Sequence, residues 1–172
     1  MYQRILVPVD GSPTSNAGLA EAIKLAKLTA ARMRLLHFIN EMPYMMSTEG
    51  YSSVAVDMLA SLKEAGTGIL EQARIQVEAQ GIVVDTVLLD TFGARLCELV
   101  VEQVAEWGAD VIVLGTHGRR GVRRVLLGSD AEQIVRTATV PVLLIRGKEA
   151  EVMPEKATFL PQGSEPLALA GR

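Results

Sequence analysis

The chain has 172 residues, of which 49% are hydrophobic and 22% charged, and its formal net charge is −3 at pH 7. These values are typical of a globular domain with a sizeable core, and they give no general attraction to nucleic acid or to an anionic membrane. Cys97 is the only cysteine in the sequence, which excludes an intramolecular disulfide framework and fits a reducing compartment. With no signal-like leader and no apolar run long enough to cross a bilayer, a cytoplasmic protein is expected.

The chain begins with an apolar run, a turn and an amphipathic segment. Residues 4–9 predict a buried strand, and Asp10-Gly11-Ser12-Pro13 follows it. Ser12 is expected to be the N-cap of a helix, with Pro13 in the first turn. Apolar spacing predicts that this helix packs through Leu19, Ala22, Ile23, Ala26 and Ala30.

A second apolar run covers residues 33–39 and is continuous instead of alternating, which indicates a strand buried on both faces of a parallel sheet. His37 interrupts this run. A hydrogen-bonded core histidine is favoured there over a ligand role. Residues 40–53 show no usable period and predict a loop.

A long helix is predicted over residues 54–80. The apolar residues expected on its buried face are Met58, Leu62, Ala65, Ile69, Ala73 and Val77. Gly66 and Gly68 each weaken a helix by about 1 kcal/mol relative to alanine, which indicates a kink or a close contact. Gly81 is expected to end the helix as its C′ residue.

Two further strand–helix units follow. Strands are predicted at 83–89, 111–114 and 142–145, with a turn at 91–93 after the first. One helix is expected to bury Leu96, Leu99, Val100, Val104 and Trp107 and to end at Gly108, with Cys97 as a buried inert thiol. A second is expected to start near Asp130, to stop before Pro141, and to bury Ala131, Ile134, Val135 and Ala138. Residues 148–172 lack a period and predict a disordered or loosely packed tail after a domain at 1–147.

The loop after residue 114 has the composition of an anion site. Gly115, Gly118 and Gly128 precede Ser129, which forms a predicted capping box with Glu132. Exposed amides and the dipole of a helix N-terminus favour a phosphate, and glycine lets it approach the backbone. The alternative is that these are plain turn glycines and a plain helix cap. The spacing matches neither a Walker A loop nor a dinucleotide fingerprint.

The order of elements predicts a doubly wound α/β domain. Gly-x2-Gly-x9-Gly-Ser after a buried strand resembles the ATP-binding signature of the universal stress protein family. The likeness covers about residues 1–146, including the segments at 7–12, 36–39, 115–119 and 141–145. It implies a five-stranded parallel sheet in the order 3-2-1-4-5 with helices on both faces, similar to the adenine nucleotide alpha-hydrolase fold. A ligand in such a sheet binds where the strand order reverses.

The resemblance also implies a set of site residues. In ATP-binding members, the aspartate that matches Asp10 lies near the adenine and ribose. The residue that matches Phe38, usually valine, offers main-chain groups to the adenine, and phenylalanine here would leave those groups available while crowding the base. The full set implied to line the nucleotide is Pro8, Val9, Asp10, Phe38, Gly115, Thr116, His117, Gly118, Arg119, Gly128, Ser129 and Asp130.

Asp130 has two interpretations. It is either a partner of the helix dipole, which is favoured, or an indirect contact to Mg²⁺ bound by the triphosphate. Arg119, Arg120, Arg123 and Arg124 add positive field around the cradle, most of them in solvent.

The sequence shows no Ser-His-Asp set and no metal-ligand spacing, and His117 is expected to position a ligand or its own loop. We therefore expect a stress-response sensor or regulator that binds ATP or a related adenine nucleotide, with slow hydrolysis at most. By the resemblance it forms a homodimer through the exposed edge strand at 142–145. The alternatives are an interaction module with a vestigial cradle, an enzyme acting on the nucleotide, and a site for a cyclic nucleotide. No nucleic-acid or membrane partner is expected.

Overall fold

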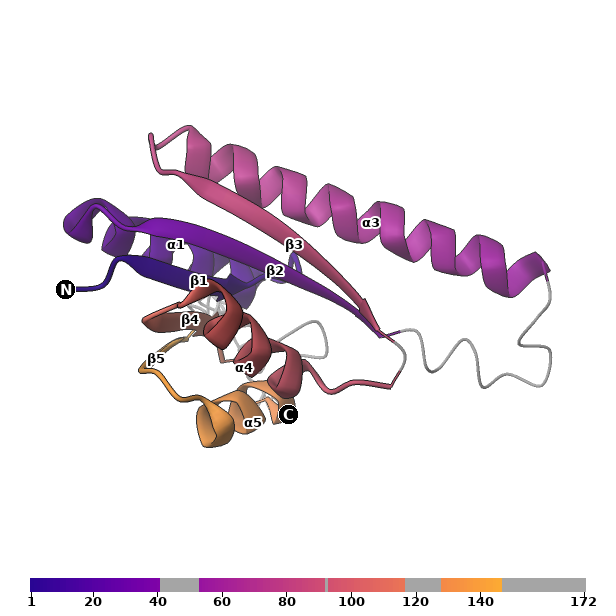
Figure 1. Ribbon diagram of the computed structural model, residues 1–172. Coiled ribbons are helices and arrows are strands. Elements are labelled where there is room, and N and C mark those ends of the chain that lie inside the picture. The colour runs from indigo at the N-terminus through magenta and orange to yellow at the C-terminus, as the bar shows by residue number, and fades with distance from the viewer. Residues whose placement is uncertain (41–52, 92, 117–127, 147–172) are drawn as a thin grey trace, which may run out of the picture.

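A computed structural model describes residues 1–40, 53–91, 93–116 and 128–146. Within these ranges one parallel sheet has the strand order β3-β2-β1-β4-β5 (Figure 1). The strands are β1 (Arg4–Pro8), β2 (Arg32–Asn40), β3 (Val84–Thr91), β4 (Val111–Gly115) and β5 (Val142–Ile145). The expected order is confirmed. It reverses between the neighbours β1 and β4, so the segments that leave these two strands start side by side.

Helices cover both faces of the sheet, with α1 (Pro13–Thr29) and α3 (Ser53–Glu78) on one face and α4 (Leu96–Trp107) and α5 (Ser129–Thr137) on the other (Figure 1). Side chains of β1 alternate between the two faces. Ile5 and Val7 belong to the core under α1 and α3, and Leu6 belongs to the core under α4 and α5. All three are fully buried, which explains why the strand is continuously apolar in sequence.

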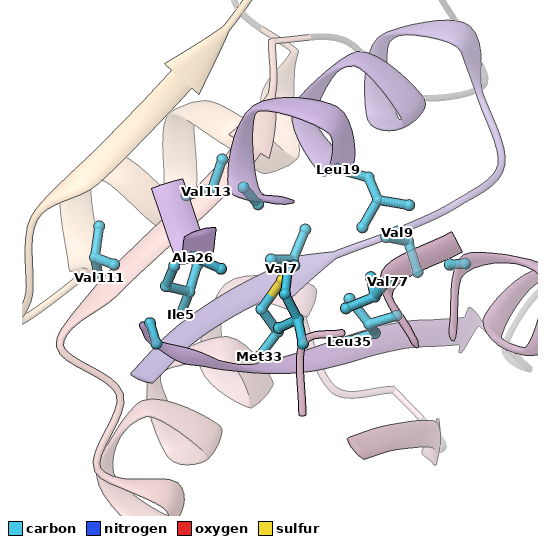
Figure 2. Close-up of a cluster of buried hydrophobic side chains, with 14 of the residues drawn as sticks. Ile5, Val7, Val9, Leu19, Ala26, Met33, Leu35, Val77, Val111 and Val113 are labelled. Atoms are coloured by element: carbon cyan, nitrogen blue, oxygen red, sulfur yellow. The ribbon is translucent and has the colours of Figure 1, made fainter. Parts of the chain in front are cut away.

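Figure 2 shows the core under α1 and α3, where side chains of β1 and β2 meet Leu19 and Ala26 of α1 and Val77 of α3. The buried face predicted for α1 is largely confirmed, with Ile23 partly buried. Ala30 was wrongly placed on it. It lies beyond the last helical residue as the C-cap, exposed, with a left-handed φ of 53°. Helical spacing alone does not show where the helix ends.

Two predicted helix ends are confirmed. The Ser12 hydroxyl caps α1 by accepting from the Ser15 backbone N–H at 3.1 Å, and Pro13 is the first helical residue. Gly108 is the C-cap of α4 with φ 67°. In α3 the last helical residue is Glu78, and Gly81 follows with φ 74°.

The predicted buried face of α3 is confirmed at Ala73 and Val77 but not in the first half of the helix. Gly66 and Leu70 lie against the sheet, whereas Met58 and Ala65 are exposed. The reason is the size of Gly66. A Cβ there would lie 2.7 Å from Cδ2 of His37 and 3.0 Å from Cδ1 of Leu88, so α3 makes its closest approach at a residue without a side chain. Apolar periodicity does not detect such a contact, but the close contact that the sequence analysis inferred from the glycines is confirmed at Gly66. A Cβ on Gly68 would meet nothing within 4 Å.

Of the predicted loop at 40–53, Asn40 is the last residue of β2 and Ser53 the first of α3, and the residues between them lie outside the described part of the chain, as does the predicted tail at 148–172. In the parts of the chain that are described, no helix combines the length and the apolar character needed to cross a membrane.

The two α3 glycines provide a matched test of this packing. Gly68→Ala is expected to raise the free energy of unfolding by up to about 1 kcal/mol, because alanine favours the helix and the added methyl meets open space. Gly66→Ala is expected to lower it by roughly 1–3 kcal/mol, because the methyl overlaps the buried His37 ring. Chemical denaturation measures both values. Equal stabilisation by the two alanines would contradict the close approach at Gly66.

Candidate functional site

The strand register places Asp10 opposite one residue on the β2 side and one on the β4 side. Pro8 pairs with Leu36 of β2, and Leu6 pairs with Ile112 of β4. Continuing both registers past the end of β1 brings Asp10 opposite Phe38 and Thr116. By side-chain alternation these three positions belong to the α4 and α5 face, as Leu6 and Leu36 do. Three predicted site residues from separate parts of the chain therefore converge at one edge of the sheet.

Backbone groups of β2 alternate between its two neighbours. Arg32 N–H donates to Gln3 O on the β1 side, Met33 N–H donates to Val83 O on the β3 side, and Leu36 O accepts from Val9 N–H. The same alternation directs the N–H and C=O of Phe38 toward the β1 side. Because β1 ends at Pro8, these groups face the space beyond that strand, where Asp10 lies.

The loop after β1 is held by its own hydrogen bonds. The Asp10 carboxylate accepts from Ser12 N–H at 2.9 Å, and Asp10 N–H donates to the Ser15 hydroxyl at 3.1 Å. Gly11 between them has φ 77°, in the left-handed region that suits glycine. Sequence analysis identified Ser12 but missed Ser15. The signal was a polar residue three places after the N-cap, where side chains bond back to the preceding loop.

Backbone hydrogen bonds join the two ends of the segment that connects β4 to α5. Thr116 N–H donates to Ile145 O, and Gly128 N–H donates to Thr116 O, both at 2.9 Å. These bonds place the start of α5 directly beside the end of β4. The residues between them, 117–127, lie outside the described part of the chain, and with them the predicted site residues His117, Gly118 and Arg119.

The N-terminus of α5 corrects the predicted capping box. Gly128 is the N-cap with extended ψ of 146°, and Ser129 is already helical, so its side chain is not at the capping position. The Glu132 carboxylate instead pairs with Arg136 at 2.8 Å. Glu132 N–H to Gly128 O is the first helical bond. The amides of Ser129, Asp130 and Ala131 therefore precede the hydrogen-bonded ladder, and Ser129 and Asp130 are exposed.

Gly115 has a packing role that sequence analysis did not foresee. A Cβ on Gly115 would lie 2.6 Å from the Thr14 carbonyl oxygen, and one on Gly18 would lie 3.1 Å from Gly115 N. The first turns of α1 thus rest directly on the end of β4. Helix–strand packing therefore requires a glycine at this position, and the role in ligand approach that the sequence analysis gave it stays a prediction.

Two buried groups match their predictions. His37 is 5% exposed, and its Nδ1 lies 2.7 Å from Val9 O, as predicted for a core histidine. Cys97 is buried as predicted, with its Sγ 3.5 Å from Oε1 of Gln133.

The charged residues near this edge of the sheet include one ion pair between α3 and β3. At the carboxyl end of β3, Lys63 of α3 lies 2.5 Å from the Asp90 carboxylate, and this hydrogen bond lowers the pKa of Asp90. No cluster of three or more potential metal ligands of the His, Cys, Asp or Glu type occurs among the described residues.

Sequence and structure comparisons agree on the family. The model of the universal stress protein family matches residues 1–146. Universal stress protein MJ0531 of Methanocaldococcus jannaschii is 31% identical over 152 residues, which cover 88% of this chain and 86% of that protein. The solved structure of hypothetical protein MJ0577, from the same organism, superposes with a TM-score of 0.74 at 26% identity, covering 87% of this chain and 99% of that one. The chain belongs to the universal stress protein family.

Two more distant structures share the fold and carry ligands. A universal stress protein from Archaeoglobus fulgidus, in complex with dAMP, has a TM-score of 0.60 at 22% identity and covers 84% of this chain and 98% of its own. Another universal stress protein, in complex with cAMP, has a TM-score of 0.57 at 23% identity and covers 85% and 98%.

The packing role of Gly115 can be tested without a ligand. Gly115→Ala is expected to lower the free energy of unfolding by roughly 1–3 kcal/mol, because the methyl would overlap backbone atoms of Thr14 that cannot rotate away. Chemical denaturation of the ligand-free protein measures this, with Gly68→Ala as the control for a glycine-to-alanine change in open space. Unchanged stability of Gly115→Ala would show that α1 and β4 are not in such close contact.

Proposed function

We propose that this chain binds an adenine nucleotide, with ATP as the leading candidate, at the carboxyl edge of β1, β2 and β4. The observation that carries the proposal is the convergence of the Asp10 turn, the Phe38 backbone and the N-terminus of α5 at the strand-order reversal. Family membership supports it. The dAMP and cAMP complexes of two proteins with this fold show that the fold can hold an adenine nucleotide.

The phosphates are assigned to the start of α5. The amides of Ser129, Asp130 and Ala131 come before the first helical bond, and the positive end of the helix dipole adds to their attraction for an anion. Gly128 N–H is already bonded to Thr116 O, so Gly128 serves to place the helix start. His117, Gly118 and Arg119 are proposed to complete the phosphate site from the neighbouring segment.

The base and ribose are assigned to the opposite side of the site. The backbone groups of Phe38 point toward the space beyond β1 and can bond the adenine edge, while the Asp10 carboxylate lies level with them for a sugar hydroxyl. Pro8, the last residue of β1, and Val9 after it are proposed to line the site between the base and the ribose through their backbone. The half-buried Phe38 side chain narrows the room for the base.

The negative charge of Asp130 lies close to the proposed phosphate site and affects how the charge of a triphosphate is neutralised. It is exposed in the first turn of α5, where an acid stabilises an empty helix N-terminus and opposes a bare phosphate. Mg²⁺ held by the phosphates removes that opposition. We therefore propose that the ligand enters as its magnesium complex, without a metal site made of protein groups alone.

We assign the chain a regulatory, cytoplasmic role in the stress response, with the nucleotide as a signal and its hydrolysis slow at most. A homodimer is proposed through the edge strand β5, where Leu143 is 41% exposed. The sequence had placed Val135 of α5 in the core, and its exposed fraction of 42% corrects that prediction.

Isothermal titration tests the ligand. Nucleotide-free protein is expected to release heat when ATP is added. Its affinity for ATP is expected to be higher with Mg²⁺ than with EDTA, because the metal screens Asp130 from the phosphates. AMP and cAMP are titrated in parallel, and phosphate release is followed at the same time. Heat with cAMP alone would assign a cyclic nucleotide. No heat with any of them would favour an interaction module, and rapid turnover would favour an enzyme.

A matched pair at Ser129 tests the phosphate assignment. Ser129→Pro removes one backbone donor and should preserve the helix, because proline suits the first helical position and the extended Gly128 suits the residue before it. ATP binding is expected to weaken about tenfold or more, the value of a hydrogen bond to a charged group. Ser129→Ala keeps the amide and removes only the hydroxyl. Unchanged affinity in Ser129→Pro would exclude this amide as a phosphate ligand.

A further inference from the structure

His37 connects the core to the loop that carries Asp10. Its ring is buried on the α3 side of β2, and Nδ1 lies 2.7 Å from the carbonyl oxygen of Val9, the residue before Asp10. A carbonyl can only accept a hydrogen bond, so Nδ1 carries the proton and donates it. The acceptor residue, Val9, directly follows Pro8, the last residue of β1, where the chain leaves the sheet.

Helix α3 holds this ring in place. The absent side chain of Gly66 leaves room for the ring, since a Cβ there would lie 2.7 Å from Cδ2 and 3.2 Å from Nε2 of His37. Such contacts leave the ring little freedom to tilt or withdraw from Val9.

The same helix also touches the loop directly. A Cβ on Gly11 would lie 3.4 Å from Cγ1 of Ile69, one turn of α3 beyond Gly66. The helix therefore supports the loop on both sides of Asp10, through His37 at Val9 and through Ile69 at Gly11. In each case a glycine provides the space for contact.

We propose that His37 is a positioning residue for the nucleotide site. By holding the Val9 carbonyl it fixes the direction in which the chain leaves β1, and so presents the turn in which the Asp10 carboxylate accepts from Ser12 N–H. The claim that His37 affects nucleotide affinity rests on the proposed function. The claim that His37 orders the Asp10 turn does not depend on it.

Two variants separate the hydrogen bond from the bulk of the ring. In His37→Asn the side-chain amide nitrogen can occupy the place of Nδ1 and donate to Val9 O, whereas His37→Leu keeps apolar bulk and has no donor. Hydrogen exchange of the Ser12 amide reports on the Asp10 turn, and titration with ATP reports on the site. In His37→Leu we expect faster Ser12 exchange and affinity about tenfold weaker, the effect of losing one hydrogen bond. In His37→Asn both are expected to stay near those of the natural protein.

Val77→Ala provides the control for lost core packing. Val77 is fully buried in the same core, near the far end of α3, so its truncation lowers global stability without contact to the Asp10 turn. Under native conditions its Ser12 exchange and ATP affinity are expected to match those of the natural protein. If Val77→Ala accelerates Ser12 exchange as much as His37→Leu does, global stability is the cause and the positioning role is excluded.

The remaining outcomes are equally distinct. Equal Ser12 exchange in His37→Leu and His37→Asn, whether both fast or both slow, overturns the proposal because the donor then makes no difference. Failure of the natural protein to bind ATP overturns the ATP assignment alone, since the exchange comparison still decides what His37 does to the turn.

Discussion

The pairing of β1 with β4 at the centre of the sheet is the constraint on which the rest of the structure depends. Two strands far apart in sequence become neighbours there, and the chain leaves both at the same edge. The first turns of α1 then cross the end of β4 so closely that Gly115 and Gly18 meet backbone to backbone. This contact fixes the distance between the loop after β1 and the start of α5, which no local sequence preference can set.

The two helices that start at this crossing differ in how their N-termini are capped. On the β1 side, a buried serine cap and the Asp10 carboxylate satisfy the amides of the turn, so the start of α1 is closed. On the β4 side, α5 begins at a glycine, and within the described part of the chain no side chain caps its first amides. The two helix starts thus differ in the described residues, and in general an uncapped helix N-terminus attracts an anion more than a capped one.

Helix α3 acts as a second layer behind this site. Its contact at Gly66 presses His37 toward the Val9 carbonyl, and its Ile69 meets Gly11 in the adjoining loop. The Lys63–Asp90 pair holds the same part of the helix against the end of β3. A helix on the opposite face of the sheet from α5 therefore contacts the loop after β1.

Short-range sequence patterns determined much of this protein. Continuous apolar runs predicted the buried parallel strands, Ser12-Pro13 predicted the start of α1, Gly108 the end of α4, and an apolar setting predicted a core role for His37. The glycine loop before Ser129 was found as an anion site from its local pattern, whereas the family likeness supplied the strand order and the remaining candidate site residues, because those depend on the whole chain.

Only the tertiary structure decided why particular glycines occur where they do and which residue caps α5. Gly115 and Gly66 are explained by atoms of Thr14 and His37, which are distant in sequence and become neighbours only in the folded sheet. At α5, Ser129 with Glu132 has the composition of a capping box, yet the bond from Gly128 to Thr116 starts the helix one residue earlier. Local patterns report the preferences of a few adjacent residues. Close contacts between separate elements arise only from the way those elements pack.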